Sequence, residues 1–336
     1  MNGTAVAAVA IILTACAPRA AAEISRTEYV LGTFCTIRLV KGGSPALIDR
    51  VWARLRQLEN DLTVNQAGSQ IDSVNKAAGE RAVAIGQDAI AILKKDLRYA
   101  SISDGAFDPS VGPLVKLWGI GTERAAVPSA KDREEALKLV GWKDIVLDEN
   151  AGTIFLRRKG MALDLGSGTK GYAADLAVDM LRAGGVKSAI IDLGGNVFAL
   201  GAKTDGKPWR IGLQNPFSTR GDYLGIASLT DQTMVTSGIY ERFFEKDGKH
   251  YHHILDTRTG FPVDNGLVSV TVIAPKSFDA DGFTTTLFAV GRQKALELGK
   301  ATGVDVIIVD AARKVYMSSG VSNYFEITDP AFTLAE

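Results

Sequence analysis

The sequence has few side chains that carry a proton or bind a soft metal near neutral pH. Its 336 residues include three histidines, His250, His252 and His253, and two cysteines, Cys16 and Cys35. Two cysteines provide no disulfide framework and no thiolate metal site, so any metal must use oxygen or imidazole ligands. Net charge is also absent, because 38 Lys and Arg balance 38 Asp and Glu. We therefore expect no nucleic-acid partner, which a basic surface would attract.

The N-terminus has a different character from the rest of the chain. A short apolar run, residues 5–16, ends at Cys16 and is too short to span a bilayer as a mature helix. Its ending, LTAC, resembles a bacterial lipobox, in which the cysteine becomes the lipidated first residue of the mature protein, although MNGTA lacks the usual Lys or Arg. We expect a lipoprotein signal peptide over residues 1–15, lipidation at Cys16 and a tether over residues 16–27. Cys35 would then be the only free thiol, as a small core residue.

The rest of the chain interleaves helical and strand patterns without a clear linker, and 46% of its residues are hydrophobic. A segment rich in Gly, Pro and Asp, residues 104–121, predicts a shaped loop. Caps and periodicity predict helices over 45–62, 87–101, 129–140, 171–184, 278–291 and 292–303. Strands are predicted over 28–40, 161–165, 188–193, 196–202, 209–214, 223–229, 234–245, 250–255 and 269–274, with a hairpin in 144–158 and closing strands near 304–327. These patterns predict one α/β domain of mixed α+β type, with interleaved helices and mixed or antiparallel sheets, over residues 28–336.

The glycine-rich stretch DLGSGTKG, residues 164–171, has three possible interpretations. Its GxGxxG pattern, with Asp192 about twenty residues later, fits a dinucleotide fingerprint, but no further strand and helix run completes a Rossmann sheet. Ser167 and Lys170 have the SxxK spacing of penicillin-binding proteins, without their SDN or KTG partners. The glycines could instead serve only tight packing of a strand against a helix. Lys170 at a helix start favours a bound anion such as phosphate, since a cation there opposes the helix dipole.

A second oxygen-rich pattern occurs in FDADGFTTTLF. Asp281 and Thr285 are four residues apart on a predicted helix, which places both side chains on one face. One carboxylate with a neutral oxygen suits Mg²⁺, which completes its octahedron with water and phosphate oxygens. Asp279 is an alternative carboxylate. The structural interpretation is a helical Asp beside a Thr that bonds back to its own backbone.

All three histidines fall in HYHHILDTRTGFP, residues 250–262. One interpretation is a strand with two outward histidines, followed by a turn at Asp256–Gly260. The other is a functional group, because histidine is the usual side chain for proton transfer near neutral pH.

Together these segments resemble a known family. YVLGTFCTI, FDPSVGPLVKLWG, LDLGSGTKGYAAD, IIDLGGNVFALG, TSGIYERFF, HHILDTRTGFP and ADGFTTTLFAVG resemble, in that order, the ApbE family of FAD:protein FMN transferases, over about residues 28 to 326. Members are typically periplasmic lipoproteins that bind FAD and Mg²⁺. They split the FAD pyrophosphate and attach FMN through a phosphoester to a Thr or Ser of a target protein. The resemblance therefore implies an ApbE-like domain and a periplasmic enzyme that is lipid-anchored to the inner membrane.

The resemblance also implies roles for individual residues. Asp281 and Thr285 would bind magnesium through their side chains, and Ser167 through its backbone carbonyl. His253 would orient or deprotonate the attacking hydroxyl, or stabilise charge beside it. His250 and His252 match no motif position and should be ordinary strand residues. The FAD contacts would come from Leu31, Asn65, Ala106, Phe107, Asp108, Asp164, Lys170 and Leu255.

The chain departs from the family pattern at Asn65, where a tyrosine usually covers the flavin. Asparagine is common in loops for its local hydrogen bonding. Here it is similar to the flavin-trafficking branch of the family, in which Mg²⁺-dependent FAD pyrophosphatase activity accompanies FMN transfer. We expect both activities, and expect acceptors among membrane redox-pump subunits or extracytoplasmic reductases. A pure flavinyltransferase and a non-catalytic FAD-storage lipoprotein are the alternatives.

Overall fold

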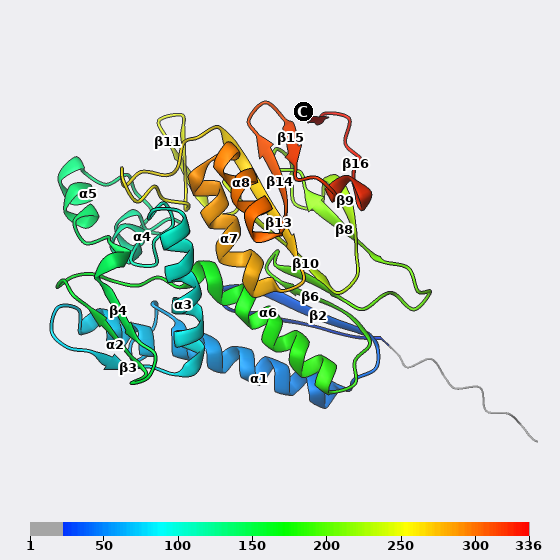
Figure 1. The fold of residues 1–336 in the computed structure, drawn as a ribbon, viewed down its shortest axis with the longest axis horizontal. Coiled ribbons are helices and arrows are strands. Elements are labelled where there is room, and N and C mark those ends of the chain that lie inside the picture. The colour runs from blue at the N-terminus through cyan, green and yellow to red at the C-terminus, as the bar shows by residue number, and fades with distance from the viewer. Residues whose placement is uncertain (1–22, 336) are drawn as a thin grey trace, which may run out of the picture.

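The computed structural model describes residues 23–335, and Figure 1 shows helices packed against a large central sheet. The helices are α1 (Pro45–Leu62), α2 (Gln70–Lys76), α3 (Gln87–Ile102), α4 (Gly112–Trp118), α5 (Ala130–Leu137), α6 (Gly166–Ala183), α7 (Ser277–Val290) and α8 (Arg292–Thr302), with short 3₁₀ turns at Trp142–Asp144 and Val321–Asn323. Helices α1, α6 and α7 lie one beside the next along the sheet.

The central sheet has nine strands in the order β1-β2-β6-β7-β10-β13-β14-β15-β17. Neighbouring strands are antiparallel throughout, except that β15 and β17 are parallel. The strands are β1 (Ile24–Val30), β2 (Thr33–Lys41), β6 (Ser188–Leu193), β7 (Val197–Leu200), β10 (Gln232–Gly238), β13 (Leu267–Ala274), β14 (Asp305–Asp310), β15 (Lys314–Met317) and β17 (Thr333–Leu334). The predicted mixed α+β class with antiparallel sheets is confirmed.

Three smaller sheets complete the fold. One contains β16 (Phe325–Ile327), β9 (Tyr223–Leu229) and β8 (Trp209–Gln214), in that order. Another contains β3 (Val83–Ala84), β5 (Thr153–Leu156) and β4 (Ile145–Asp148), and confirms the predicted hairpin in 144–158. The last is the ribbon of β11 (Phe243–Lys246) and β12 (Lys249–His252).

Both faces of the central sheet are covered, as the alternating side chains of β14 show. Val306 and Ile308 pack in the cluster formed with α7 and α8, whereas Ile307 and Val309 pack in the cluster formed with β8, β9 and β16. Successive strand residues point to opposite faces, so this split requires apolar cover on each side. Strand β13 is buried along its whole length for the same reason.

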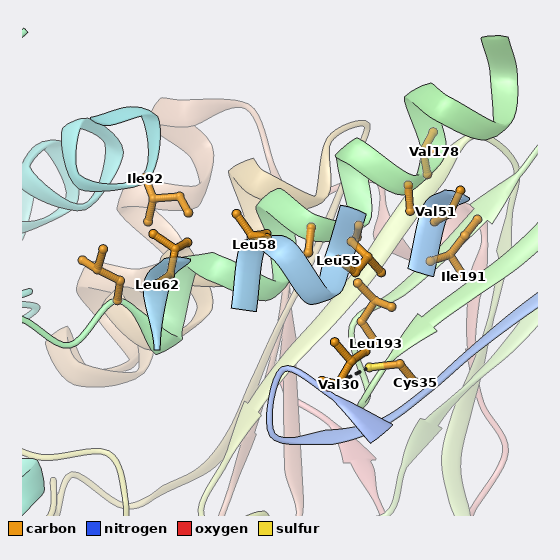
Figure 2. Close-up of a cluster of buried hydrophobic side chains, with 14 of the residues drawn as sticks. Val30, Cys35, Val51, Leu55, Leu58, Leu62, Ile92, Val178, Ile191 and Leu193 are labelled. Carbon is orange, nitrogen blue, oxygen red and sulfur yellow. Dashed lines mark hydrogen bonds between the residues drawn. The ribbon is translucent and has the colours of Figure 1, made fainter. Parts of the chain in front are cut away.

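The largest core cluster joins the β1-β2 hairpin to α1 and α6 (Figure 2). Val51, Leu55 and Leu58 occupy one face of α1 at helical spacing and are fully buried. Cys35 lies in this core, where its thiol donates to the carbonyl of Val30 at 3.4 Å. Burial raises the pKa of Cys35 to about 12, so the thiol stays protonated and serves as a core residue, as the sequence predicts.

Several predicted element ends are confirmed by their caps. The Ser44 hydroxyl accepts from the N–H of Leu47, with Pro45 in the first turn of α1. Ser129 caps α5 in the same way, by accepting from the N–H of Asp132. Helix α5 ends at Leu137, before the predicted residue 140.

Other strand predictions were wrong at points where a turn interrupts the pattern. The segment 28–40 is two strands, because Leu31 and Gly32, both with positive φ, reverse the chain between β1 and β2. Strand β1 begins at Ile24, so the C-terminal part of the predicted tether belongs to the sheet. The predicted signal peptide and Cys16 lie outside the described residues. Within residues 23–335, no helix is long and apolar enough to cross a membrane.

The strand predicted over 161–165 is also wrong, whereas the helix and the strand predicted after it are confirmed as α6 and β6. Residues 161–165 form only an isolated bridge, in which Ala162 pairs with Val111. Helix α6 begins at Gly166 and not at residue 171, so the glycines lie inside its first two turns. The segment 234–245 divides into β10 and β11, and β12 ends at His252. The turn at Asp256–Gly260 is confirmed, with the N–H of Gly260 donating to the carbonyl of Asp256 at 2.8 Å.

Candidate active site

A cavity of about 880 Å³ lies where the start of α6, the middle of α7 and the loops around β2, β10 and β12 meet. Cavities of this size are typical of cofactor and substrate sites. Apart from Cys16, every residue assigned to the site from sequence lines it: Leu31, Asn65, Ala106, Phe107, Asp108, Asp164, Ser167, Lys170, His253, Leu255, Asp281 and Thr285.

Helices α6 and α7 make a close contact at the bottom of this site. The N–H of Gly171 donates to Asp281 Oδ2 at 2.7 Å. A Cβ atom on Gly171 would lie 2.4 Å from the carbonyl oxygen of Ser277 and 2.6 Å from Cβ of Asp281. Gly171 therefore does serve tight packing, as one interpretation of the glycines proposed. The contact is between the helices α6 and α7, however, and not between a strand and a helix. The antiparallel sheet excludes the Rossmann interpretation.

Lys170 extends into the cavity beside Asp281, with 3.9 Å between its Nζ and Asp281 Oδ1. Asp281 is only 4% exposed. Burial raises the pKa of this carboxyl, and Lys170, the N–H of Gly171 and the side chain of Asn196 lower it. The expected anion near Lys170 is thus supplied in part by Asp281, and the Lys170 ammonium still faces the cavity.

The three threonines of α7 differ in their hydroxyl partners. Thr284 and Thr286 bond back to the helix, to the carbonyls of Asp281 and Gly282. The Thr285 hydroxyl makes no such back bond among the described residues. It lines the cavity and lies 3.1 Å from Ser237 Oγ, which also lies 2.8 Å from the Thr284 hydroxyl. The structural interpretation of a back-bonded threonine therefore fails at Thr285.

The oxygens around Asp281 suit a hard divalent cation. Asp281 and Thr285 line this cavity with a carboxylate and a hydroxyl, ligand types that Mg²⁺ prefers, and Ser167 lines it as well. The N–H of Gly171, whose usual helical acceptor is the carbonyl of Ser167, points to Asp281. Within residues 23–335, no three His, Cys, Asp or Glu side chains gather to hold a metal. Asp279, the alternative carboxylate, points away and pairs with Lys95.

His253 lies just beyond the end of β12 and is fixed by one carbonyl. The carbonyl of Arg242 accepts from the backbone N–H of His253 at 3.1 Å and from its Nδ1 at 3.2 Å. Because a carbonyl only accepts, Nδ1 carries the proton and Nε2 keeps its lone pair. Burial and then the charge of Arg242 lower the pKa of His253 to about 4. The ring is therefore neutral near pH 7, with Nε2 able to accept a proton.

The other two histidines have structural partners. His252 is 5% exposed, with its Nε2 donating to the carbonyl of Val263 at 2.9 Å and its Nδ1 accepting from the N–H of Ile254. His250 stacks on Phe243 with ring centroids 4.3 Å apart. The expectation of strand positions is confirmed, but the outward orientation predicted for His252 is wrong.

Two aspartates shape the loops at the cavity wall. Asp108 Oδ1 accepts from the N–H and hydroxyl of Ser110, and its Oδ2 accepts from the N–H of Trp142. Both carboxylate oxygens of Asp108 are thus occupied in holding the 104–112 loop. Asp164 Oδ1 accepts from the N–H of Gly166 at 2.9 Å, which fixes the entry to α6.

Two residues lie at the opening of the cavity. Asn65 is exposed in the loop after α1, with its N–H bonded to the Thr63 hydroxyl, and it lines the cavity. Leu31 sits in the β1-β2 turn with φ of 57°, a conformation that costs a branched residue energy.

Sequence reasoning missed three residues that the structure places at or below the site. Asn196 and Arg242 lie within the motifs IIDLGGNVFALG and TSGIYERFF, and both line the cavity. Asp96 of α3 gave no sequence signal. Its carboxylate is fully buried between Gly168 and Gly282, with no hydrogen-bond partner among the described residues. Burial, and then Asp281 and Asp164, raise the pKa of Asp96 well above its usual range.

Comparison with known proteins gives a consistent result. The model of the ApbE family matches residues 31–308. The FAD:protein FMN transferase of Klebsiella pneumoniae strain 342 is 40% identical over 292 residues, which is 87% of this chain and 90% of that protein. The FAD:protein FMN transferase of Treponema pallidum strain Nichols is 37% identical over 330 residues, 93% of this chain and 91% of that protein.

Solved structures agree with the sequence matches. The flavin transferase ApbE from Vibrio cholerae superposes with a TM-score of 0.82 at 25% identity, covering 90% of this chain and 99% of that chain. The ApbE protein from Thermotoga maritima gives a TM-score of 0.82 at 29% identity, with the same coverage. The family match over most of the chain, together with these identities, shows that the chain belongs to the ApbE family.

Proposed function

We propose that the chain is a magnesium-dependent FAD:protein FMN transferase that also hydrolyses FAD to FMN and AMP. The observation that carries this proposal is the gathering of distant segments in one cavity, with the Asp281 carboxylate, the Lys170 ammonium and the His253 imidazole all facing it. These groups suit phosphoryl transfer. The carboxylate can bind a metal ion, the ammonium can compensate phosphate charge, and the neutral imidazole can accept the proton of the attacking hydroxyl. The name shared by its curated relatives supports the same reaction.

The magnesium ligands would be Asp281 and Thr285 through their side chains and Ser167 through its carbonyl. Bound there, the ion would neutralise charge that develops on the phosphoryl oxygens. Two hydrogen bonds within the protein would position these ligands. The N–H of Gly171 orients the Asp281 carboxylate, and Ser237 holds the Thr285 hydroxyl toward the cavity.

FAD would place its two phosphates beside the start of α6. The Lys170 ammonium would lie against the phosphate oxygens, where it compensates their charge in a partly buried site. Asp108 and Asp164 keep the surrounding loops in place through their backbone hydrogen bonds. The reacting phosphorus is the one that belongs to the FMN half.

The transfer step requires a base for the attacking hydroxyl, and His253 is suited to that role. Nε2 would take the proton as the oxygen of a Thr or Ser side chain bonds to the FMN-side phosphorus. The bond from that phosphorus to the bridging oxygen breaks, and AMP leaves with the oxygen. The carbonyl of Arg242 holds Nδ1–H, so the imidazole keeps the orientation and tautomer that this step needs.

Hydrolysis would be the same displacement with water as the attacking group. The exposed Asn65 leaves the flavin end of the cavity open to water, which supports a pyrophosphatase activity beside FMN transfer. A pure flavinyltransferase would release little AMP without an acceptor. A non-catalytic FAD-storage lipoprotein would hold intact FAD, but it would have no need for the neutral histidine base at the cavity wall.

The place of action is proposed from the sequence. Lipidation at Cys16 would anchor the enzyme to the inner membrane, with the catalytic domain in the periplasm. Acceptors there would be flavin-bearing subunits of membrane redox pumps or extracytoplasmic reductases.

The test is to incubate protein lacking residues 1–22 with FAD, in Mg²⁺ or in EDTA, and to quantify FMN and AMP by chromatography. Many turnovers that stop in EDTA are the expected result. Bound, intact FAD with little AMP would contradict the pyrophosphatase activity and favour a transferase that requires its acceptor. Failure to label any acceptor protein as well would leave FAD storage as the function.

A further inference from the structure

Strand β8 borders the active-site cavity by its edge. Four consecutive residues of β8, Ile211 to Gln214, line the cavity. Side chains alternate between the two faces of a sheet, so a cavity above one face would contact every second residue. Contact with consecutive residues indicates that the cavity borders the edge of the strand.

Within residues 23–335, this edge of β8 has no strand partner. Strand β8 is the last strand of its sheet and pairs only with β9 on its other side. Among residues 23–335, no backbone group outside that pairing bonds to residues 210–213. An open strand edge presents unpaired N–H and C=O groups that another extended chain can join.

A second hollow of about 550 Å³ lies next to the cavity, beyond the end of β8. Gln214, Arg220, Tyr240 and Glu241 line both spaces. The second hollow has apolar and aromatic walls, formed by Ile239, Phe217, Phe243, His250 and Val268.

Two of these aromatic side chains are partly exposed. Phe217 is 40% exposed and Phe243 is 44% exposed. They come from different segments, the loop after β8 and the ribbon strand β11, and both face the same hollow. Exposed aromatic residues gathered at a concave surface typically mark a binding site for a polypeptide or ligand.

We propose that an extended segment of the flavin acceptor polypeptide pairs with the free edge of β8 and places an apolar side chain in the hollow between Phe217 and Phe243. This inference rests on the proposed transferase function, since such an enzyme must bring a Thr or Ser of another polypeptide to FAD. This occupant is favoured because the hollow adjoins the cavity that β8, Lys170 and His253 line. A segment bound along β8 would deliver its hydroxyl to the reacting phosphorus.

Main-chain pairing also defines what the acceptor must provide. Backbone hydrogen bonds to β8 would require an extended conformation and tolerate varied side chains, because every residue except proline supplies the same groups. The hollow would select an apolar residue on one side of the acceptor hydroxyl. The recognised unit is therefore a short, exposed strand or loop and not a whole domain surface.

The test begins with a pool of short synthetic peptides, each with one central Thr or Ser and randomised flanks. Peptides that acquire covalent FMN are identified by mass spectrometry and remade with Ala in place of the acceptor residue. Hydrogen exchange of the enzyme with FAD is then compared with and without this unreactive peptide. We expect the fast-exchanging amides of residues 210–214 to become protected by at least about tenfold only when peptide is bound. Peptide binding that leaves these amides unchanged would overturn the inference.

Two substitutions test the hollow. F217A and F243A should each raise the KM for the labelled peptide by about tenfold, equivalent to about 1.4 kcal/mol, with FAD affinity and FAD hydrolysis unchanged. F261A is the matched control, because Phe261 is 37% exposed but packs on Trp118 and Arg133 outside the hollow. A wild-type KM for the peptide in both F217A and F243A would contradict this inference but not the proposed transferase function. A wild-type enzyme that labels no peptide and no protein would contradict the proposed transferase function, and the inference would fail with it.

Discussion

The backbone N–H of Gly171 in α6 donates to the carboxylate of Asp281 in α7, 2.7 Å away, and this bond fixes the main acidic group of the cavity. The two residues are 110 positions apart in the chain. A carboxylate that accepts from a backbone amide has a fixed position and orientation, which a metal ligand requires. The absence of a side chain at Gly171 is what allows α7 to approach closely enough.

Gly171→Ala should damage both the fold and the cation site. The added methyl group would lie 2.4 Å from the backbone oxygen of Ser277, so α6 and α7 would have to separate. We expect a loss of about 1–3 kcal/mol in the free energy of unfolding, measured by denaturant titration, and weaker Mg²⁺ binding by calorimetry. Gly86→Ala is the control, because its new methyl group would meet only the flexible side chain of Gln70. Equal stability of the two variants would contradict the close-contact argument.

Asp281→Asn should weaken Mg²⁺ binding at the proposed site and so slow the formation of FMN. The amide keeps the size of the carboxylate but supplies no negative charge, so Mg²⁺ affinity and FMN formation should each fall by on the order of 10² or more. Calorimetric titration of Mg²⁺ provides a readout that is independent of turnover. Asp279→Asn serves as the control, because Asp279 pairs with Lys95 away from the cavity. Wild-type Mg²⁺ affinity in Asp281→Asn would exclude Asp281 as a ligand.

His253→Ala should slow FMN formation and transfer by about 10²–10⁴-fold while FAD still binds. His250→Ala should have little effect on FMN formation from FAD, since His250 stacks on Phe243 and does not line the cavity that holds His253. The pKa of His253 is lowered to about 4, so its neutral form predominates at neutral pH, and the wild-type rate should show no titration of this group near the usual histidine pKa of about 6.5. Rates in His253→Ala within about threefold of wild type would contradict the proposed base.

Asn65→Tyr should separate hydrolysis from FAD binding. A tyrosine ring at the open end of the cavity would cover the flavin and exclude water, because Asn65 is exposed and lines that end. We expect slower release of FMN and AMP and protein that purifies with more bound FAD, measured by chromatography and flavin absorbance. Asn65→Ala should stay fast, since it adds no ring. Unchanged FMN and AMP release in Asn65→Tyr would refute this role.

Asp96→Asn should stabilise the metal-free protein increasingly as pH rises. The unfolded chain ionises Asp96 near pH 3.9, whereas burial keeps the folded pKa well above that value. Stability from the neutral folded group is fully present below the unfolded pKa and is lost as pH rises toward the folded pKa. Thermal unfolding in EDTA from pH 4 upward should show a growing advantage for the variant. Asp247→Asn, at an exposed turn, should show none.

A constant difference between Asp96→Asn and wild type across pH would mean that Asp96 has similar pKa values in the folded and unfolded states. That result would contradict the buried, unpartnered environment of its carboxylate.

The sequence predicted the residues that line the cavity more accurately than the turns and the ends of some helices and strands. Local signals such as Ser44 with Pro45 gave the start of α1 correctly, because a cap depends on residues that are neighbours in the chain. The break at Leu31 was missed, since a leucine with positive φ is uncommon and gives no turn signal. The early start of α6 was missed because three glycines in a helix oppose local propensity, which packing against α7 overrides.

By itself, the sequence determined the fold class and the core role of Cys35 through hydrophobic periodicity and caps. The resemblance of its ordered motifs to the ApbE family gave most of the residues that gather in the cavity, but not Asn196 or Arg242. Only the tertiary structure decided the rest. It showed that Nε2 of His253 is the free nitrogen, that Asp281 and not Asp279 faces the cavity, and that Asp96 is buried beneath it. These properties depend on burial and on contacts between segments far apart in the chain, so no local pattern could have specified them.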